Sequence, residues 1–461
     1  MNFDEYPWPI KKGNTVFGHQ KETSKFALNN PRCFILNDMG TGKTLSALWA
    51  ADILLINGKI DKVLVVGPLS TLMSTWVKDI VFNLPHRKYC IVHGTKERRA
   101  ELLKSDADFY IINHDGIKIM EDEIIQRNFK LIIIDELTAF KTAKTERTKA
   151  MARVARRAKG VWGMTGEPTP NSPEEAYGQA KVVNPGNPYL PPYFTQYRNM
   201  VMERLNMFIY VPKPGASKIV NRILQPAIRY KREDCVDLPP CLYETRDVPL
   251  SVEQAHAYET MRKQLLVEHA QGQISAVNAA VKISKLLQIA AGDVKDDDGN
   301  IISYNAAPRL NELYDIYQET PQKKLVVFCA NRASVERVAA FMQSKGAESG
   351  IIYGSVSQKD RAQLISSFQG GTLNCLVIQP QAASHGITLH AANTVVWYSI
   401  LPSNEVYNQA NHRIIRIGQI RNQYIIHLMG CKAEKRYLKI LEGKQSQSDE
   451  TLSLFEEFLE P

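Results

Sequence analysis

Long hydrophobic runs are absent from this sequence of 461 residues. No stretch approaches the roughly 18 consecutive apolar residues that a membrane-spanning helix needs. The first residues also lack the basic segment followed by an apolar one that marks a secretory signal. These absences argue against a membrane span and against secretion.

Cysteine is sparse, and no two cysteines form a CxxC pair. Structural zinc sites commonly draw on such pairs, so their absence argues against one. Scattered thiols are typical of a reducing compartment, and we expect a cytoplasmic protein. The cysteines are Cys33, Cys90, Cys235, Cys241, Cys329, Cys375 and Cys431.

Composition and charge describe a soluble globular chain with a basic excess. Hydrophobic residues make up 44% and charged residues 23%, which excludes a disordered chain, and the length predicts two or three domains. There are 57 Lys and Arg against 48 Asp and Glu, a net charge of +9. This excess favours a polyanionic partner but does not identify one.

Short apolar runs rich in Val and Ile predict strands buried on both faces of parallel sheets. Helical spacing between the runs predicts βα units, and thus an α/β fold in two halves. Between the halves, the Pro-rich stretch 182–194 predicts a loop. Ser251 is a suitable N-cap for a helical segment over 251–290. Asp-Gly within 294–304 predicts a hairpin. The predicted strands lie in 32–38, 62–68, 108–114, 130–136, 324–330, 350–355, 375–379 and 393–399.

The stretch "NDMGTGKT" (37–44) lies between a predicted strand and a predicted helix. Gly40 and Gly42 allow the backbone to curl so that its N–H groups face phosphate oxygens at a helix N-terminus. Lys43 supplies positive charge to the β- and γ-phosphates, and Thr44 can ligate Mg²⁺. The strict pattern has Gly at position 37, where this chain has Asn37. The alternative is a glycine loop that only caps a helix.

The stretch "LIIIDEL" delivers Asp135 and Glu136 to the carboxyl end of a predicted strand, where ligands of α/β sheets gather. Asp135 would hold Mg²⁺, and Glu136 would act as general base toward the attacking water. Taken alone, Asp-Glu after a strand could equally be a helix N-cap. The upstream phosphate loop is what favours the catalytic interpretation.

The stretch "QANHRIIRIGQ" (409–419) carries Arg413 and Arg416, three residues apart. On a helix these would share one face. Phosphoryl transfer builds negative charge that an inserted arginine stabilises, so both could serve a nucleotide held by the first half of the chain. In isolation, the same residues would describe a surface helix.

Taken together, the chain resembles the superfamily 2 helicase-type ATPases, and within them the Snf2-like (SWI/SNF-type) DNA translocases. The resemblance covers nearly the whole chain, with the motifs in family order. It implies two tandem RecA-like domains, each a mainly parallel sheet flanked by helices, over 1–235 and 245–461, with an interdomain crossing at 236–244. The supporting stretches are "FGHQ", "NDMGTGKT", "VVGPLSTLMSTW", "INHDGI", "IDEL", "MTGEPTPNS", "KREDCVDLPPCLYETRDVPLSVEQAHAY", "VVFCANR", "SHGITLHAANTVVWY" and "QANHRIIRIGQ".

The resemblance implies ATP and Mg²⁺ as cofactors and DNA as partner, with roles for particular residues. The nucleotide pocket would comprise Gln20 as the adenine reader, Gly40, Thr41, Gly42, Lys43, Thr44, Asp135, Glu136, Gly386, Gln409, Arg413 and Arg416. The strand-tracking face would comprise Ser70, Thr71, His114, Thr165, Asn331, Arg332 and Ser384. The stretch that begins with Asp135 and Glu136 is the family's motif II, and this chain has Thr138 where that motif often has His. The chain also departs from the family pattern at Glu167, Ala383, Ser384 and Ser399.

The basic stretch 141–160 carries cations at helical spacing. They would form either a solvated helix face or a contact with phosphate backbones. The cations are Lys149, Arg153, Arg156 and Arg157.

The resemblance implies a DNA-dependent ATPase that moves along DNA, expected to remodel forked or branched DNA in replication, recombination or repair. Its compact length argues against chromatin remodelling, and small chains of this kind resemble those of bacteria and bacteriophages. Three alternatives stay open: a duplex translocase that does not separate strands, a motor subunit for a nuclease or modification partner, and RNA as the substrate. A catalytically dead module is disfavoured by Lys43, Asp135 and Arg416.

Overall fold

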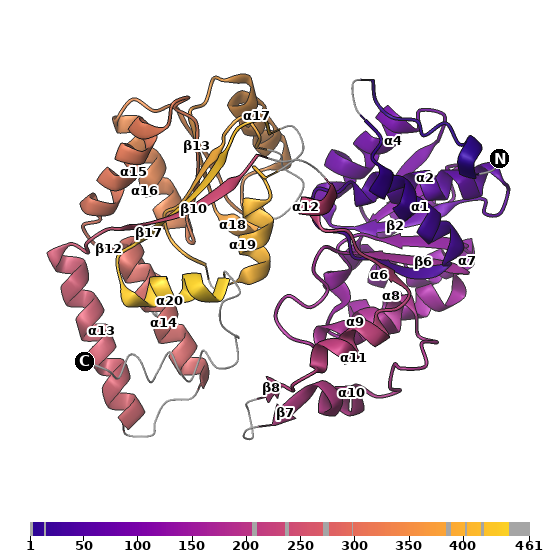
Figure 1. Ribbon diagram of the computed structural model, residues 1–461, viewed down its shortest axis with the longest axis horizontal. Coiled ribbons are helices and arrows are strands. Elements are labelled where there is room, and N and C mark those ends of the chain that lie inside the picture. Colours follow the sequence, from indigo (N-terminus) through magenta and orange to yellow (C-terminus); the bar gives the residue numbers. More distant parts are fainter. Residues whose placement is uncertain are drawn as a thin grey trace. The chain divides into compact units, whose positions relative to one another are not determined.

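The computed structural model describes most of the chain and divides it into two units, residues 1–237 and 238–461. None of the helices in this described part combines the length and apolarity that a membrane span needs. Figure 1 shows the elements of each unit. The described residues are 3–12, 15–204, 210–235, 239–270, 276–296, 298–383, 389–401, 403–415 and 419–441.

Unit 1 is built on a seven-stranded parallel sheet. In sheet order its strands are β3 (Tyr89–Val92), β4 (Phe109–Asn113), β2 (Val63–Gly67), β5 (Leu131–Ile134), β6 (Gly160–Met164), β1 (Arg32–Ile35) and β9 (Ala227–Ile228). Every residue of β2, β5 and β6 is buried, because helices cover both faces of the sheet.

The helices of unit 1 cover both faces of this sheet, and a small hairpin is added after α10 (Figure 1). The longer ones are α1 (Gly18–Asn29), α2 (Lys43–Ile56), α5 (Lys96–Leu103), α8 (Glu146–Arg157), α9 (Glu175–Val183), α10 (Phe194–Val201) and α11 (Ala216–Ile223). The shorter elements are η1 (Phe3–Glu5), α3 (Leu69–Thr71), η2 (Leu72–Val77), α4 (Lys78–Asn83), α6 (His114–Ile119), α7 (Glu121–Arg127), η3 (Leu137–Phe140), β7 (Met202–Arg204), β8 (Tyr210–Pro212) and α12 (Arg232–Cys235).

Unit 2 is built on a six-stranded parallel sheet. In sheet order its strands are β10 (Cys241–Asp247), β17 (Gln423–Met429), β16 (Thr394–Trp397), β13 (Leu325–Phe328), β15 (Cys375–Ile378) and β14 (Ser349–Ile352). Residues 241–244, which the sequence assigned to the crossing, therefore begin a strand of this sheet. The helices over it are α15 (Ala307–Glu319), α16 (Arg332–Ser344), α17 (Gln358–Gly370), α18 (Pro380–Ala383), α19 (Asn404–Asn411) and α20 (Lys432–Leu441).

Besides the apolar clusters on the two faces of this sheet, a further cluster in unit 2 gathers α13 (Val252–Ala270), α14 (Ala276–Ala291), α20 and a two-stranded hairpin. Ser251 and Gln254 cap α13 reciprocally, with Gln254 N donating to Ser251 Oγ and Ser251 N to Gln254 Oε1, both at 3.2 Å. The hairpin pairs β11 (Asp293–Lys295) with β12 (Ile301–Ser303) antiparallel, which confirms the predicted turn.

The predicted α/β class is confirmed, since both large sheets are parallel and flanked by helices (Figure 1). Each of the eight predicted apolar runs contains a strand. The order of strands in unit 1 places the ends of β5, β6 and β1 side by side at one edge. The chemistry-bearing motifs follow these strands.

Candidate active site

The loop after β1 has the backbone geometry of a phosphate cradle. Gly40 and Gly42 have φ of 85° and 82°, a left-handed conformation that side chains disfavour. At Gly42 a Cβ atom would also lie 2.1 Å from Gln20 Nε2. α2 starts directly at Lys43, whose Nζ donates to the carbonyls of Asn37 at 2.7 Å and Asp38 at 3.1 Å. The ammonium group is thus held within the curl of the loop.

Asn37 and Asp38 tie this loop to the last segment of unit 1. Tyr230 N donates to Asn37 Oδ1 at 3.0 Å, and Arg232 N donates to Asp38 Oδ2 at 3.1 Å. Asp38 N donates in turn to Tyr230 O at 2.9 Å. Asn37 is buried and its amide nitrogen donates to Thr23 Oγ1 at 2.8 Å. The departure from Gly at position 37 therefore has a structural role.

Gln20 lies against the same loop from the first turn of α1. Its Oε1 accepts a hydrogen bond from Phe17 N at 3.1 Å, and its Nε2 lies 3.4 Å from Thr41 O. His19, stacked on Phe17, has Nε2 2.8 Å from the same Thr41 carbonyl. The predicted adenine reader is therefore placed beside the phosphate loop. Its contact with a base stays a prediction.

Asp135 and Glu136 follow β5 at the same edge of the sheet. Asp135 Oδ2 accepts from Trp76 Nε1 at 2.9 Å, and its Oδ1 accepts from Glu136 N at 3.1 Å. These donors fix the orientation of the carboxylate. Glu136 has φ 48° and ψ 61°, a left-handed conformation that costs a non-glycine residue free energy. Strain of this kind is typical of functional sites.

His114 joins the end of β4 to motif II. Its Nε2 lies 2.8 Å from the carbonyl oxygen of Asp135, and its ring packs edge-on against Phe140 at 5.3 Å. The side chain is buried, with 8% of the residue exposed. The sequence placed His114 on the strand-tracking face. The contact ties the end of β4 to the backbone of Asp135, and contact of His114 with DNA stays a prediction.

Thr165 follows β6, between the ends of β5 and β1. Thr165 N donates to Ile35 O at 3.2 Å, and its Oγ1 lies 3.3 Å from both the backbone N and the carbonyl O of Glu167. Gly166 lies close to the phosphate loop, where a Cβ would be 3.3 Å from Met39 Cγ and 3.4 Å from Met39 N. The start of the stretch "MTGEPTPNS" therefore packs against the phosphate loop, and Thr165 is buried.

The predicted arginine motif lies in unit 2. Gln409 on α19 is buried, and its Nε2 lies 3.4 Å from Glu405 Oε1. Arg413 is buried as well, but α19 ends at Asn411, so Arg413 lies in the following turn. The expectation that Arg413 and Arg416 share a helix face is thus wrong for Arg413. Arg416 and Gly386 lie outside the described residues.

The remaining predicted strand-tracking residues differ in exposure. Thr71 is buried and donates from Oγ1 to Pro68 O at 3.0 Å. Asn331 caps α16 by accepting from Ser334 N at 2.8 Å, whereas the neighbouring Arg332 is exposed. The side chain of Ser70 and all of Ser384 lie outside the described residues. Contact of these residues with DNA stays a prediction.

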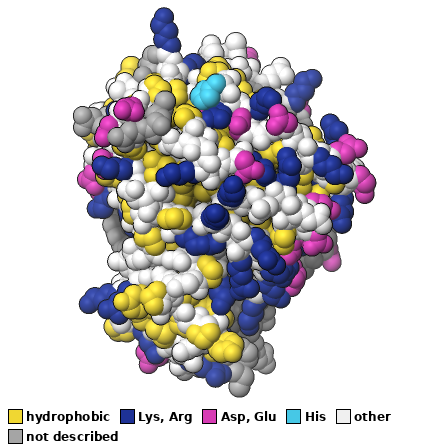
Figure 2. Space-filling view, turned by 90° about the vertical axis from the view of Figure 1, so that its right-hand side faces the viewer, with side chains coloured by type: hydrophobic (Ala, Val, Ile, Leu, Met, Phe, Trp, Pro, Cys, Tyr) yellow, Lys and Arg dark blue, Asp and Glu magenta, His cyan; other side chains and the backbone are white. Residues whose placement is uncertain are grey.

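The predicted basic stretch forms α8, with Thr145 as its N-cap. Lys149 Nζ pairs with Glu146 at 2.8 Å, and Arg153 Nη2 donates to Glu121 at 2.7 Å, as a solvated face would. Arg156 and Arg157 are exposed in the last turn. On the face shown in Figure 2, Lys and Arg side chains gather in the lower part with few acidic ones among them. This distribution is compatible with a polyanionic partner.

Comparison with protein families agrees with this geometry. The model of the SNF2-related domain matches residues 19–295, and that of the helicase conserved C-terminal domain matches 308–418. The chain belongs to the SNF2-related family. It is therefore an enzyme, an ATPase of the helicase type.

Relatives of this SNF2-related chain come from phage, bacteria and animals. Putative protein p41 of Acyrthosiphon pisum secondary endosymbiont phage 1 is 26% identical over 85% of this chain and 87% of its own length. The SWI/SNF-related subfamily A-like protein 1 of Xenopus tropicalis is 26% identical over 93% of this chain but only 44% of its own. The Bacillus subtilis putative ATP-dependent helicase/translocase YwqA is 24% identical over 91% of this chain and 46% of its own. The SNF2-related chain thus spans less than half of the latter two relatives.

Sequence reasoning missed three supports of the site. Trp76 and Asn37 lie within the motif stretches, but no motif predicts the contact of Trp76 with Asp135 or that of Asn37 with Tyr230. A buried amide at a position where the strict loop pattern has Gly was the available signal for Asn37. Tyr230 lies 193 residues from Asn37, and no local pattern reveals such a contact. Burial, with Glu22 nearby, raises the pKa of Tyr230, so its phenol stays neutral.

Proposed function

We propose that this protein is a DNA translocase or helicase that couples ATP hydrolysis to movement along DNA and remodels forked or branched DNA. The observation that carries the proposal is the convergence of three motifs at one sheet edge. The phosphate loop, Thr165, and the Asp135–Glu136 pair follow three neighbouring strands of unit 1. Family membership supports coupling to DNA, and the basic excess agrees with it.

In this mechanism Lys43 and the N–H groups of the loop bind the β- and γ-phosphates at the start of α2. Glu136 accepts a proton from the attacking water while its backbone is held in the left-handed conformation. Arg413, Arg416 and Gln409 would stabilise charge that develops on the γ-phosphate. The protein groups thus bind the phosphates, accept a proton from the attacking water and stabilise the developing charge.

The residues of the site fit Mg²⁺. Magnesium is held in nucleotide sites by one or two protein groups together with phosphates and waters, so no cluster of carboxylates is needed. Among the described residues no three His, Cys, Asp or Glu side chains gather as a metal cluster. Thr44 in the first turn of α2 and the oriented carboxylate of Asp135 would hold the ion. Magnesium would neutralise phosphate charge there.

The experiment is ATP hydrolysis without nucleic acid and with single-stranded, duplex, forked or four-way-junction DNA, and with RNA. Strong stimulation by forks or junctions supports the proposal. We propose the cytoplasm of a bacterium or of a phage-infected host as the place where the protein acts. Equal stimulation by plain duplex would instead indicate a translocase that does not separate strands. If no nucleic acid stimulates hydrolysis, the proposal fails in favour of a motor subunit that depends on a nuclease or modification partner.

A further inference from the structure

Trp76 is a buried side chain whose one polar atom bonds to a candidate metal ligand. It is fully buried in unit 1, and its Nε1 donates to Asp135 Oδ2 at 2.9 Å. The backbone of Asp135 is fixed separately, because Asp135 N donates to Val66 O of β2 at 2.8 Å. The carboxylate is therefore held by an indole that lies 59 residues away in the sequence, while its backbone is held by the neighbouring strand.

The segment that carries Trp76 departs from ordinary helix geometry. α3, η2 and α4 follow one another without a break from Leu69 to Asn83, and η2 in the middle is a π turn. A π turn contains more residues than an α-helical turn, so it changes the directions of the side chains that follow its start. Such turns are rare and are frequent at functional sites. Trp76 lies within this turn, which therefore sets the direction of its indole.

The π turn and Asp135 meet at Gly67, the last residue of β2. A Cβ atom at Gly67 would lie 3.5 Å from Asp135 Cβ and 3.7 Å from Leu72 Cδ2, the first residue of the turn. The turn thus packs beside the end of β5, where the carboxylates of motif II begin. Both the packing of the turn and the bond from Trp76 join it to the same residue, Asp135.

The other three fully buried indoles show that burial alone does not demand a bond to a carboxylate. Trp49 donates to a backbone carbonyl at 2.8 Å, and Trp397 donates to an amide oxygen at 2.9 Å. Trp162 Nε1 has no hydrogen-bond partner within the described part of the chain. Packing of a tryptophan in this protein is therefore compatible with a neutral partner or with none. The carboxylate partner is a particular feature of Trp76.

An indole suits the task of holding a ligand of Mg²⁺. It donates one hydrogen bond and carries no charge. A lysine or arginine in the same place would offset the negative charge that attracts the cation. Groups that hydrogen-bond to metal ligands set the direction of those ligands, and their loss commonly weakens metal binding about 10- to 100-fold.

We propose that Trp76 is a positioning residue that sets the affinity of the active site for Mg²⁺ by orienting Asp135. This inference rests on the proposed function, in which Asp135 holds the ion. Trp76 acts through the carboxylate, and the indole N–H is the group that matters. A role in packing alone would leave the metal dependence of nucleotide binding unchanged.

The first test measures how much Mg²⁺ tightens nucleotide binding by the full-length protein. A fluorescent, non-hydrolysable ATP analogue is titrated once with Mg²⁺ and once with EDTA, and the ratio of the two dissociation constants reports the contact between protein and metal. In Trp76→Phe this ratio should fall about tenfold, while the affinity in EDTA stays at the wild-type value. The Mg²⁺ concentration for half-maximal ATP hydrolysis should rise by the same factor. An unchanged ratio in folded Trp76→Phe would overturn the proposal.

A matched variant separates the N–H group from the bulk of the ring. Trp162→Phe removes the same atoms from a buried indole of the same apolar cluster, but it removes no hydrogen bond within the described part of the chain. It should keep the wild-type ratio, and an equal loss in both variants would assign the effect to packing and overturn the proposal. Thermal unfolding of both checks that they fold.

An isostere covers the case in which Trp76→Phe does not fold. Benzothienylalanine incorporated in place of Trp76 keeps the shape of the indole and replaces its N–H group by sulfur. The ratio should fall as in Trp76→Phe, and a wild-type ratio would overturn the proposal.

Asp135→Asn separates this inference from the function on which it rests. If Asp135→Asn removes the tightening by Mg²⁺ and loss of the Trp76 N–H group does not, the role of Trp76 fails and the assignment of Asp135 stands. If Mg²⁺ tightens binding equally in the wild type and in Asp135→Asn, both fail. Stimulation of hydrolysis by DNA is a separate measurement, so its absence would remove the proposed movement along DNA without changing this result.

Discussion

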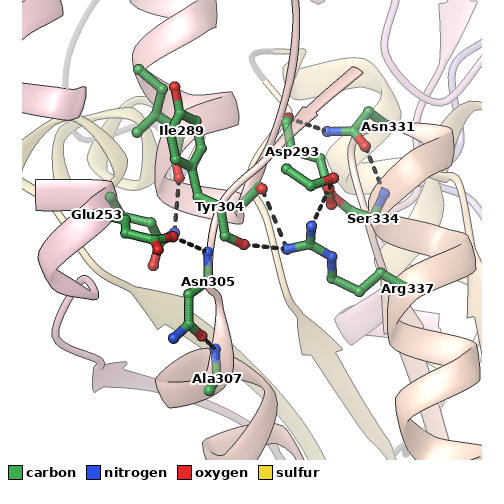
Figure 3. A network of polar contacts seen from close by, with 12 residues as sticks. Glu253, Ile289, Asp293, Tyr304, Asn305, Ala307, Asn331, Ser334 and Arg337 are labelled. Carbon is green, nitrogen blue, oxygen red and sulfur yellow. Dashed lines mark hydrogen bonds and ion pairs between the residues drawn. The ribbon is translucent and has the colours of Figure 1, made fainter. Parts of the chain in front are cut away.

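The carboxyl edges of the two sheets carry polar segments in both units, but these segments are held differently. In unit 1 the residues after β1, β4, β5 and β6 bond to one another across strands, as His114 does to Asp135 and Thr165 to Ile35. In unit 2 Ala330 N also donates across strands, to Ser399 Oγ at 2.8 Å, but Asn331 caps its own helix and the exposed Arg332 pairs with Glu336 of the same helix. An added hairpin is tied to α16, where Ser334 Oγ donates to Asp293 Oδ2 at 3.1 Å (Figure 3). The first edge is therefore held by bonds among the segments that follow its own strands, whereas the second also relies on an added hairpin.

The difference matches two kinds of ligand. A phosphate transfer site must fix each charged atom to within a fraction of an ångström, which cross-strand hydrogen bonds achieve. A surface that follows a polymer must release and rebind it, and exposed cations on helix ends suit that task. Each of the following changes breaks one side of this comparison.

The largest expected effect is on the phosphate loop. Lys43→Ala removes the ammonium group that the loop curls around, and ATP hydrolysis should fall at least about a hundredfold. The matched control is Lys59→Ala, an exposed lysine beyond the end of α2, which should hydrolyse ATP at the wild-type rate. Steady-state turnover with saturating DNA measures both. Retained hydrolysis in Lys43→Ala would contradict the assignment of this segment as a phosphate-binding loop.

Arg416→Ala should separate binding from chemistry. An arginine that acts on the transition state contributes about 10³ or more to the rate and little to nucleotide affinity. Hydrolysis should therefore fall by about that factor while a fluorescent nucleotide still binds. Loss of nucleotide binding itself would show that Arg416 is more than a transition-state group.

The stability of unit 2 depends on one buried ion pair. Arg309 donates to both carboxylate oxygens of Glu434, at 2.7 and 2.6 Å, and both side chains are buried. Glu434→Ala leaves the guanidinium unpaired and should cost about 3–5 kcal/mol of unfolding free energy. The double variant Arg309→Met with Glu434→Leu should recover most of that loss. Hydrogen exchange of unit 2 amides, with those of unit 1 as internal reference, measures the effect, and equal instability of single and double variants would contradict it.

Apolar strands were predictable because a strand that is buried on both faces appears in the sequence as a continuous run of apolar residues. Two of the strands outside these runs, β17 and β6, carry polar or glycine residues whose cost is offset by tertiary contacts. β17 contains His427, which lies 3.0 Å from Tyr407 Oη, and Gln423, which donates to Pro239 O at 3.2 Å. β6 contains Gly163, where a Cβ would lie 2.6 Å from Val183. No periodicity within the strand reveals these compensations.

The residues of the candidate site likewise divide into those that the sequence predicts and those that it does not. The glycines, Lys43 and the carboxylates follow from local motifs, because a strand, a turn and a helix start lie within one stretch of sequence. Their supports do not, since Trp76 and Asp135 are 59 residues apart and His114 and Asp135 are 21 apart. The sequence could predict which groups react, but not what orients them.

The smallest expected effect tests one of these supports. Motif II has Thr138 where related enzymes often have His, yet His114 reaches the Asp135 carbonyl from the end of β4. If this contact carries a signal from bound DNA to the carboxylates, His114→Ala should lower DNA-stimulated turnover about tenfold and leave nucleotide affinity and DNA-free turnover unchanged. His114→Gln, which keeps a donor, should retain more stimulation. An equal loss of turnover with and without DNA would instead show that His114 only supports the carboxylates. The cross-strand contacts of unit 1 would then orient the reactive groups without carrying a signal from DNA.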